Sequence, residues 1–316
     1  MNITISLIEG VFTIFSVILL AMLLKNVQLL KKEHSMLFSK IIVNVTLPAL
    51  ILSSLIGQDF NSAYLKMSLI MALVEIGCGI LGWVVARSFR LQRSETGALI
   101  LVSAFGMSTM LGYPLISQAF HGNMQAMQEA TITSEFGVGF LLFIFGPLIA
   151  MYYGGSGVDS NIILRSAKRF FISPVFLSLV MGVAFSFVSF KPDNDVFLTV
   201  CRILDVFAES NTFMVALAVG LMIELKVTDR HFLFFTLAII LKLLVKPLLT
   251  YLAVDNPKFT DMMREILIIE TAMPSAILGA VFAKQYNCNP ELVSSTVVVT
   301  LIASVFTISM LFLILF

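Results

Sequence analysis

The sequence has little charge and few of the residues that usually build metal centres or disulfide frameworks. Asp, Glu, Lys and Arg make up 12% of its 316 residues, against about 25% in an average soluble domain. The three histidines and three cysteines are widely spaced, so neither a zinc pattern nor a disulfide framework fits. The net charge of +1 argues against nucleic acid as a partner. Because no nucleophile with an adjacent base and no cofactor motif is found, the sequence does not predict an enzyme.

Apolar residues dominate instead, and they form long runs. Hydrophobic side chains make up 59% of the chain, and a helix needs about 20 apolar residues to cross a bilayer. The sequence therefore predicts an all-α polytopic membrane protein in a lipid bilayer. The first run lacks a basic leader and a cleavage site, which favours a retained helix over a signal peptide. Ten spans are predicted, at residues 5–24, 36–57, 65–86, 97–119, 130–153, 172–190, 198–222, 232–253, 263–284 and 292–316.

The connection at residues 154–171 divides these spans five and five, so we expect a first repeat at 1–153, a cytoplasmic linker, and a second repeat at 172–316. Basic residues cluster on the cytoplasmic side of membrane proteins. Twelve follow the odd-numbered spans and five lie on the other side, which predicts a cell-membrane protein with both termini outside. An odd number of spans per half makes the second half enter from the opposite side, the geometry of inverted repeats. The twelve are Lys25, Lys31, Lys32, Arg87, Arg90, Arg93, Arg165, Lys168, Arg169, Lys226, Arg230 and Lys284.

Two of the ten spans contain residues that do not fit a regular helix. Gly106, Ser108, Thr109, Gly112 and Pro114 interrupt the fourth span, and Pro274 with Gly279 interrupts the ninth. Proline removes a helical N–H and glycine lowers the cost of leaving helical geometry, so the backbone is expected to unwind in both. Paired interrupted spans in corresponding halves of a transporter indicate its substrate site.

Several ionisable side chains fall within the apolar spans, where they are costly and are functional candidates by default. Lys242 and Lys246 share one helix face. Either they pair permanently with Glu75, Glu209 or Glu270, or they act in substrate binding or in movement coupled to a cation, H+ or Na+. Two further carboxylates, Glu135 and Asp205, lie nearer a predicted interface and are expected to reach water. The candidates for coupling or charge compensation are Glu75, Glu209, Lys242, Lys246 and Glu270.

At the broken spans the chain resembles the auxin efflux carrier family. Leu111–Leu115, Leu-Gly-Tyr-Pro-Leu, is similar to the family's Gly-Ile-Pro-Leu in the fourth span. Ala272–Ser275, continuing through Val281–Asn287 and Pro290, is similar to its signature across the ninth and tenth spans. Val45–Ala49 matches its proline-containing second span.

The resemblance implies two inverted five-helix repeats, with spans 4 and 9 crossing at mid-membrane. Spans 3–5 and 8–10 would form a mobile transport domain, and spans 1, 2, 6 and 7 a scaffold with the homodimer contact. Gly112 and Gly279 are expected where the crossing backbones approach each other. The plant members have Asn in place of Met107 and Pro in place of Gly279, which argues against auxin as substrate. The implied substrate-binding residues are Met107, Ser108, Gly112, Tyr113, Pro114, Pro274, Ser275, Ile277, Leu278 and Gly279.

Two functions therefore remain open from the sequence. The first is a secondary transporter, and specifically an efflux carrier, that moves a small organic anion such as a mono- or dicarboxylate or an auxin-like acid by an elevator mechanism. The alternative is a membrane sensor of the same fold that recognises a sterol or lipid.

Overall fold

The protein is almost entirely helical. Its structure, a computed structural model, describes residues 3–155, 160–187, 195–223 and 231–315, and no β-strand occurs in these ranges. Helix accounts for 85% of the structure. The helices are α1 (Ile3–Asn26), α2 (His34–Ile41), α3 (Leu47–Leu55), α4 (Ala63–Ser88), α5 (Arg93–Ala104), α6 (Tyr113–Ala119), α7 (Met124–Ser134), α8 (Phe140–Gly154), α9 (Ser160–Phe171), α10 (Pro174–Phe187), α11 (Asp195–Met222), α12 (Phe232–Ile239), α13 (Lys246–Val254), α14 (Asp261–Ala272), α15 (Ile277–Gln285) and α16 (Pro290–Leu315). Wider π-helical turns lie between some of them: η1 (Ile42–Thr46), η2 (Ser108–Gly112), η3 (Glu135–Gly139) and η5 (Ile240–Val245).

Seven of the described helices are long and apolar enough to cross a membrane. The bent pair Leu164–Phe171 and Pro174–Phe187, with 51° between its two parts, makes an eighth if it counts as one span. The predicted fourth and ninth spans are absent from this set because each is divided: α5 is separated from η2 and α6, and α14 from α15. The structure thus shows a polytopic helical protein, and the arrangement as ten spans stays a prediction.

Contacts divide the chain into two compact units. The first comprises Met1–Tyr64, Thr109–Ile132 and Phe171–Ile223. The second comprises Leu65–Ser108, Thr133–Phe170 and Glu224–Phe316. Spans 4 and 5 are therefore shared between the units, whereas the resemblance put both wholly in one domain. The reason is that α6 packs against α1 and α11 of the first unit, while α5 packs against α8 and α16 of the second.

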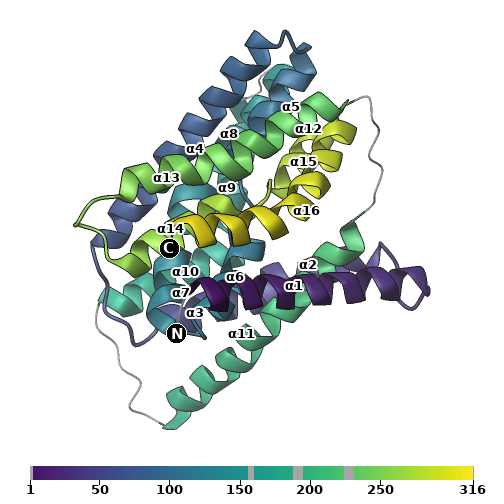
Figure 1. Ribbon diagram of the computed structural model, residues 1–316. Coiled ribbons are helices and arrows are strands. Elements are labelled where there is room, and N and C mark those ends of the chain that lie inside the picture. The colour runs from purple at the N-terminus through teal and green to yellow at the C-terminus, as the bar shows by residue number, and fades with distance from the viewer. Residues whose placement is uncertain (1–2, 156–159, 188–194, 224–230, 316) are drawn as a thin grey trace. The chain divides into compact units, whose positions relative to one another are not determined.

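The first unit is held together by close helix packing. Helix α1 lies against α11, and α3 lies against both α10 and α11 (Figure 1). Gly220 allows the close approach of α11 to α1, because a Cβ at this position would come within 2.6 Å of the carbonyl oxygen of Ile18. Small residues serve the same purpose in many membrane helix pairs.

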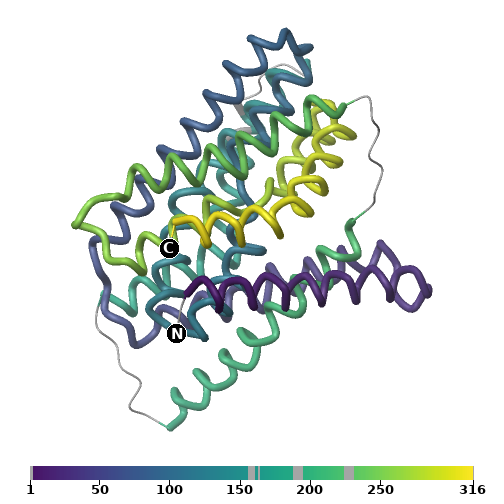
Figure 2. The backbone as a smooth tube through the Cα atoms, in the orientation of Figure 1, coloured from purple at the N-terminus to yellow at the C-terminus, as the bar shows by residue number. Residues whose placement is uncertain are grey.

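The second unit encloses four charged side chains and exposes several large apolar ones. Glu75, Lys242, Lys246 and Glu270 are at most 1% exposed, whereas Phe306 of α16 is 73% exposed. In a water-soluble domain that distribution would be unfavourable, but it is the one that a surrounding lipid phase requires. Within this unit the chain turns back sharply between α13 and α14 (Figure 2), and these two helices pack together.

Most of the predicted linker is helical. Helix α9 packs onto the second unit through Phe170, which is buried against the rings of Phe140 and Phe143. The polar side of α9 carries Arg165, Lys168 and Arg169. Linker residues 156–159 lie outside the described ranges, as do three basic residues used for the orientation, namely Lys191, Lys226 and Arg230.

Candidate transport site at the paired helix breaks

The site is built on two interruptions of helical backbone in the second unit. The first follows α5, where Phe105 adopts an extended conformation (φ −91°, ψ 133°) before η2 begins at Ser108. The second follows α14, where Met273 is extended (φ −60°, ψ 145°). The ring of Pro274 explains the second break, because proline disfavours helical geometry in the residue before it. The sequence located both breaks, but in the fourth span the chain leaves the helix at Phe105–Met107, and Pro114 lies inside the first turn of α6.

Backbone groups at the two breaks form hydrogen bonds with each other. The N–H of Met107 donates to the carbonyl oxygen of Pro274 at 2.8 Å. The N–H of Ala276 donates to the carbonyl oxygen of Phe105 at 3.0 Å. Gly106 and Ser275 therefore face each other as an antiparallel bridge. An unwound backbone is tolerated at membrane depth where protein buries it and its polar groups are paired, and this pairing meets both conditions.

Two side chains donate hydrogen bonds to carbonyl groups at the C-terminal end of α5. The hydroxyl of Ser275 donates to the carbonyl oxygen of Val102 at 2.8 Å, and the ammonium of Lys246 donates to that of Ala104 at 2.6 Å. A positive charge at this end is favourable because the carbonyl end of a helix carries partial negative charge. The N–H of Ser275 donates in turn to the hydroxyl of Thr300 at 3.2 Å, so the second break is tied to α16 as well.

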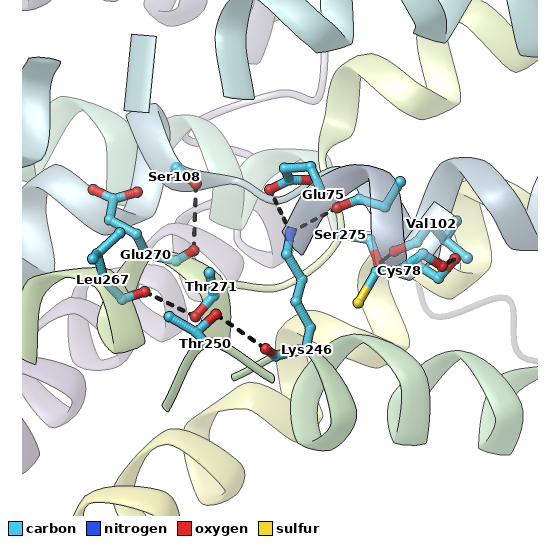
Figure 3. Close-up of polar contacts among 12 residues, drawn as sticks. Glu75, Cys78, Val102, Ser108, Lys246, Thr250, Leu267, Glu270, Thr271 and Ser275 are labelled. Carbon is cyan, nitrogen blue, oxygen red and sulfur yellow. Dashed lines mark hydrogen bonds and ion pairs between the residues drawn. The ribbon is translucent and has the colours of Figure 1, made fainter. Parts of the chain in front are cut away.

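Lys246 also forms a buried ion pair with Glu75 of α4 (Figure 3). Both side chains are at most 1% exposed. Of the three carboxylates that the sequence offered to this lysine, the structure selects Glu75. Glu209 is an exposed residue of α11 in the first unit.

Two other buried charged groups have no hydrogen-bond partner in the described part of the chain: the ammonium of Lys242 and the carboxylate of Glu270. Lys242 lies in η5, one turn before Lys246, and its Nζ is next to Gly106. Glu270 lies in the last turn of α14, just ahead of the second break. Both are fully buried.

The predicted substrate-binding residues fall into two groups. Met107, Ser108, Pro274 and Ser275 form or adjoin the paired breaks, and Ile277, Leu278 and Gly279 begin α15. Gly112, Tyr113 and Pro114 belong to η2 and α6 in the first unit and are buried there.

Two expectations about individual residues are wrong. The backbones meet at Gly106 and Ser275 and not at Gly279, where an added Cβ would find its nearest neighbour, the Cβ of Leu101, at 3.9 Å. Glu135 does not reach water, since it is 3% exposed. Sequence reasoning also missed the part played by the carbonyl of Ala104, because a main-chain acceptor leaves no signature in the residue type.

Comparisons with known proteins agree on one class. A protein-family model described as "Membrane transport protein" matches residues 6–156 and 158–312. An uncharacterized transporter of Methanocaldococcus jannaschii is 23% identical over 307 residues, covering 96% of both chains. A putative malonate transporter of Rhizobium meliloti is 27% identical over 169 residues, covering 53% of this chain and 52% of the relative. Auxin efflux carrier component 1 of Arabidopsis thaliana is 23% identical over 142 residues, covering 43% of this chain and 22% of the relative.

Proposed function

The chain belongs to the membrane transport protein family, which includes auxin efflux carriers, and we propose that it is a secondary transporter of a small organic anion. Its family consists of multi-pass membrane transporters and not of enzymes. The observation that carries the proposal is the pairing of two broken helices through Gly106 and Ser275. Transporters commonly place the substrate beside such broken helices.

The chemistry of the second break supports an anion as substrate. Helix α15 begins at Ile277 without a side-chain cap, so N–H groups of its first turn are left for another acceptor. The start of a helix also carries partial positive charge, which favours a carboxylate. One relative is named as a malonate transporter, and a dicarboxylate of that kind is the substrate class we propose. Met107, Ser108, Pro274, Ser275, Ile277, Leu278 and Gly279 would line this part of the site.

The proposed mechanism is an elevator movement in a fold of ten spans, arranged as two inverted repeats whose broken spans cross at mid-membrane. The division of the chain into two compact units supports this mechanism, since an elevator requires two bodies that each keep their internal packing. The proposal includes export as the direction, a homodimer, a location in the cell membrane and both termini outside. Gly112, Tyr113 and Pro114 remain predicted substrate contacts from the first unit, and Glu209 remains a candidate for charge compensation.

Transport can be tested directly with the purified protein in liposomes. Vesicles preloaded with unlabelled malonate should accumulate labelled malonate faster than vesicles without internal substrate, because a carrier exchanges substrate across the membrane. Protein-free vesicles and labelled methylammonium, a small cation, are the controls. A thermal-shift series with mono- and dicarboxylates, indole acids and sterols identifies the ligand class, since a ligand specific for the folded state raises the melting temperature. Stabilisation by a sterol alone, without exchange of any acid, would instead establish a membrane sensor.

A further inference from the structure

Glu270 is a buried carboxylate that forms no ion pair with any of the described residues. Neither carboxylate oxygen forms a hydrogen bond within the described residues. The nearby ammonium of Lys246 is already engaged by Glu75 and by the carbonyl oxygen of Ala104. In Figure 3 the carboxylate of Glu270 is turned toward the side of Ser108 and away from that ammonium. An ionised carboxylate cannot remain buried in this way without a compensating partner.

Oxygen atoms from two other segments surround this carboxylate. The hydroxyls of Ser108, at the start of η2, and of Ser134, at the end of α7, face it. The Ser134 side chain is fully buried, and apart from Glu270 no group in the described structure forms a hydrogen bond with its hydroxyl. The charged groups that act on Glu270 are Glu135 of η3 and Lys246 of α13. The immediate donor set is therefore made of carboxylate and hydroxyl oxygens.

We propose that Glu270, with the hydroxyls of Ser108 and Ser134, binds a sodium ion. Carboxylate and hydroxyl oxygens are ligands for hard cations, and sodium sites in transporters lie beside broken helices. A divalent ion is disfavoured, because among the described residues no group of three or more His, Cys, Asp or Glu side chains could hold one. A proton is the simpler way to neutralise Glu270. A carboxylic acid could donate to one hydroxyl and accept from the other, whereas a sodium ion would contact all of these oxygens at once, and the test below separates the two.

The position of the site connects ion binding to the paired breaks. Ser108 directly follows Met107, whose N–H is hydrogen-bonded to the carbonyl oxygen of Pro274. The hydroxyl of Ser108 donates to the main-chain carbonyl oxygen of Glu270 at 3.4 Å. Glu270 lies three residues before Met273, where the second break begins. An ion held by Ser108 and Glu270 would therefore fix both breaks in one arrangement. Coupling of this ion to substrate movement rests on the proposed function, but binding of the ion does not.

The test measures ion binding to the full-length protein in the absence of any substrate. Melting temperature is followed as NaCl replaces choline chloride or KCl at constant ionic strength, and radioactive sodium binding is measured on the same preparations. We expect saturable stabilisation by sodium alone, because an ion that binds only the folded state raises its melting temperature. Glu270→Gln should abolish both signals. Glu265→Gln, the same change on the same helix, should leave both unchanged.

Ser134→Ala provides a second variant in case Glu270→Gln does not fold. It removes one ligand hydroxyl and keeps the carboxylate, so it should weaken sodium binding roughly tenfold, the lower end of what loss of a supporting metal-site interaction costs. Equal stabilisation by sodium and choline in the wild type would refute the site, as would unchanged sodium binding in Ser134→Ala. Stabilisation that follows acidic pH and ignores sodium would show that Glu270 takes a proton instead. Failure of malonate exchange with intact sodium binding would overturn the proposed function and leave this site standing.

Discussion

The ammonium of Lys242 lies directly beside the α-carbon of Gly106. A Cβ placed on Gly106 would lie 2.8 Å from Nζ of Lys242 and 3.6 Å from Cε of the same side chain. The glycine that pairs with Ser275 thus leaves room for a buried cation, and a methyl group at this position would force the ammonium to move.

We predict that Gly106→Ala destabilises the protein by about 1 kcal/mol, the lower end of the cost of overpacking an interior, because the atom that must move is the end of a flexible side chain. The loss should largely disappear in the double variant Gly106→Ala with Lys242→Met, because methionine lacks the terminal nitrogen that the new methyl group would meet. Thermal unfolding of the four proteins of this double-mutant cycle measures the coupling.

Gly279→Ala is the matched control for Gly106→Ala. Its added Cβ would make only an ordinary contact at 3.9 Å, and alanine is the better helix former within α15. The melting temperature should stay the same or rise slightly. A larger loss of stability in Gly279→Ala than in Gly106→Ala would reverse our placement of the backbone crossing.

Because Lys246 and Glu75 form a buried ion pair, removing either side chain alone should destabilise the protein strongly. Lys246→Met leaves Glu75 buried without its cation and should cost about 3–5 kcal/mol, seen as low yield and a lowered melting temperature. Adding Glu75→Leu should restore much of the stability, since an apolar pair can replace a buried ion pair. If Lys246→Met alone melts like the wild type, the pair has no structural role.

Orientation in the membrane is testable by labelling introduced cysteines in intact cells. Lys168→Cys in α9 and Lys258→Cys between α13 and α14 are both at exposed positions and are predicted to lie on opposite sides. An impermeant maleimide should reach position 258 from outside and position 168 only after the cells are opened. The reverse pattern would invert the assignment.

Maleimide labelling of the native cysteines sets the background signal in that experiment. Burial raises the pKa of the Cys288 thiol to about 11, so near neutral pH it stays protonated and reacts slowly, because the thiolate is the nucleophile. Cys78 is also buried, whereas Cys201 is partly exposed and should be replaced by serine. Gly154 is unsuitable for labelling, because any Cβ there would collide with the carbonyl oxygen of Tyr286.

Met107→Asn should favour carboxylate ligands over uncharged ones. The side chain lies at the first break, while its N–H is held by Pro274, so the backbone can keep its course. An amide supplies two N–H donors, and one new hydrogen bond to a charged group changes affinity roughly tenfold. Ligand-dependent thermal shifts compare this variant with Met36→Asn, a control at an exposed position of α2. Equal shifts for acids and for their neutral amides would place Met107 away from the ligand.

The sequence alone determined the membrane class, the positions of the long apolar helices and the existence of two broken spans. These are local properties, because the length of an apolar run sets what can cross a bilayer and the ring of Pro274 acts on the residue before it. The family also follows from local motifs around Pro114 and Pro274. The sequence determined the exact position of the break in the fourth span less well, because Gly106, Gly112 and Pro114 all permit one. Only the pairing of Gly106 with Ser275 shows at which residue the helix is interrupted.

Only the tertiary structure decided which residues meet. Lys246 had three possible carboxylate partners in the sequence, and the one it binds is 171 residues away. The burial of Glu135, the approach of Lys242 to Gly106 and the hydroxyls facing Glu270 likewise depend on how separate helices pack. Helical and turn preferences act over a few neighbouring residues, whereas the charge balance of a buried site is a sum over side chains that the fold brings together from distant parts of the chain.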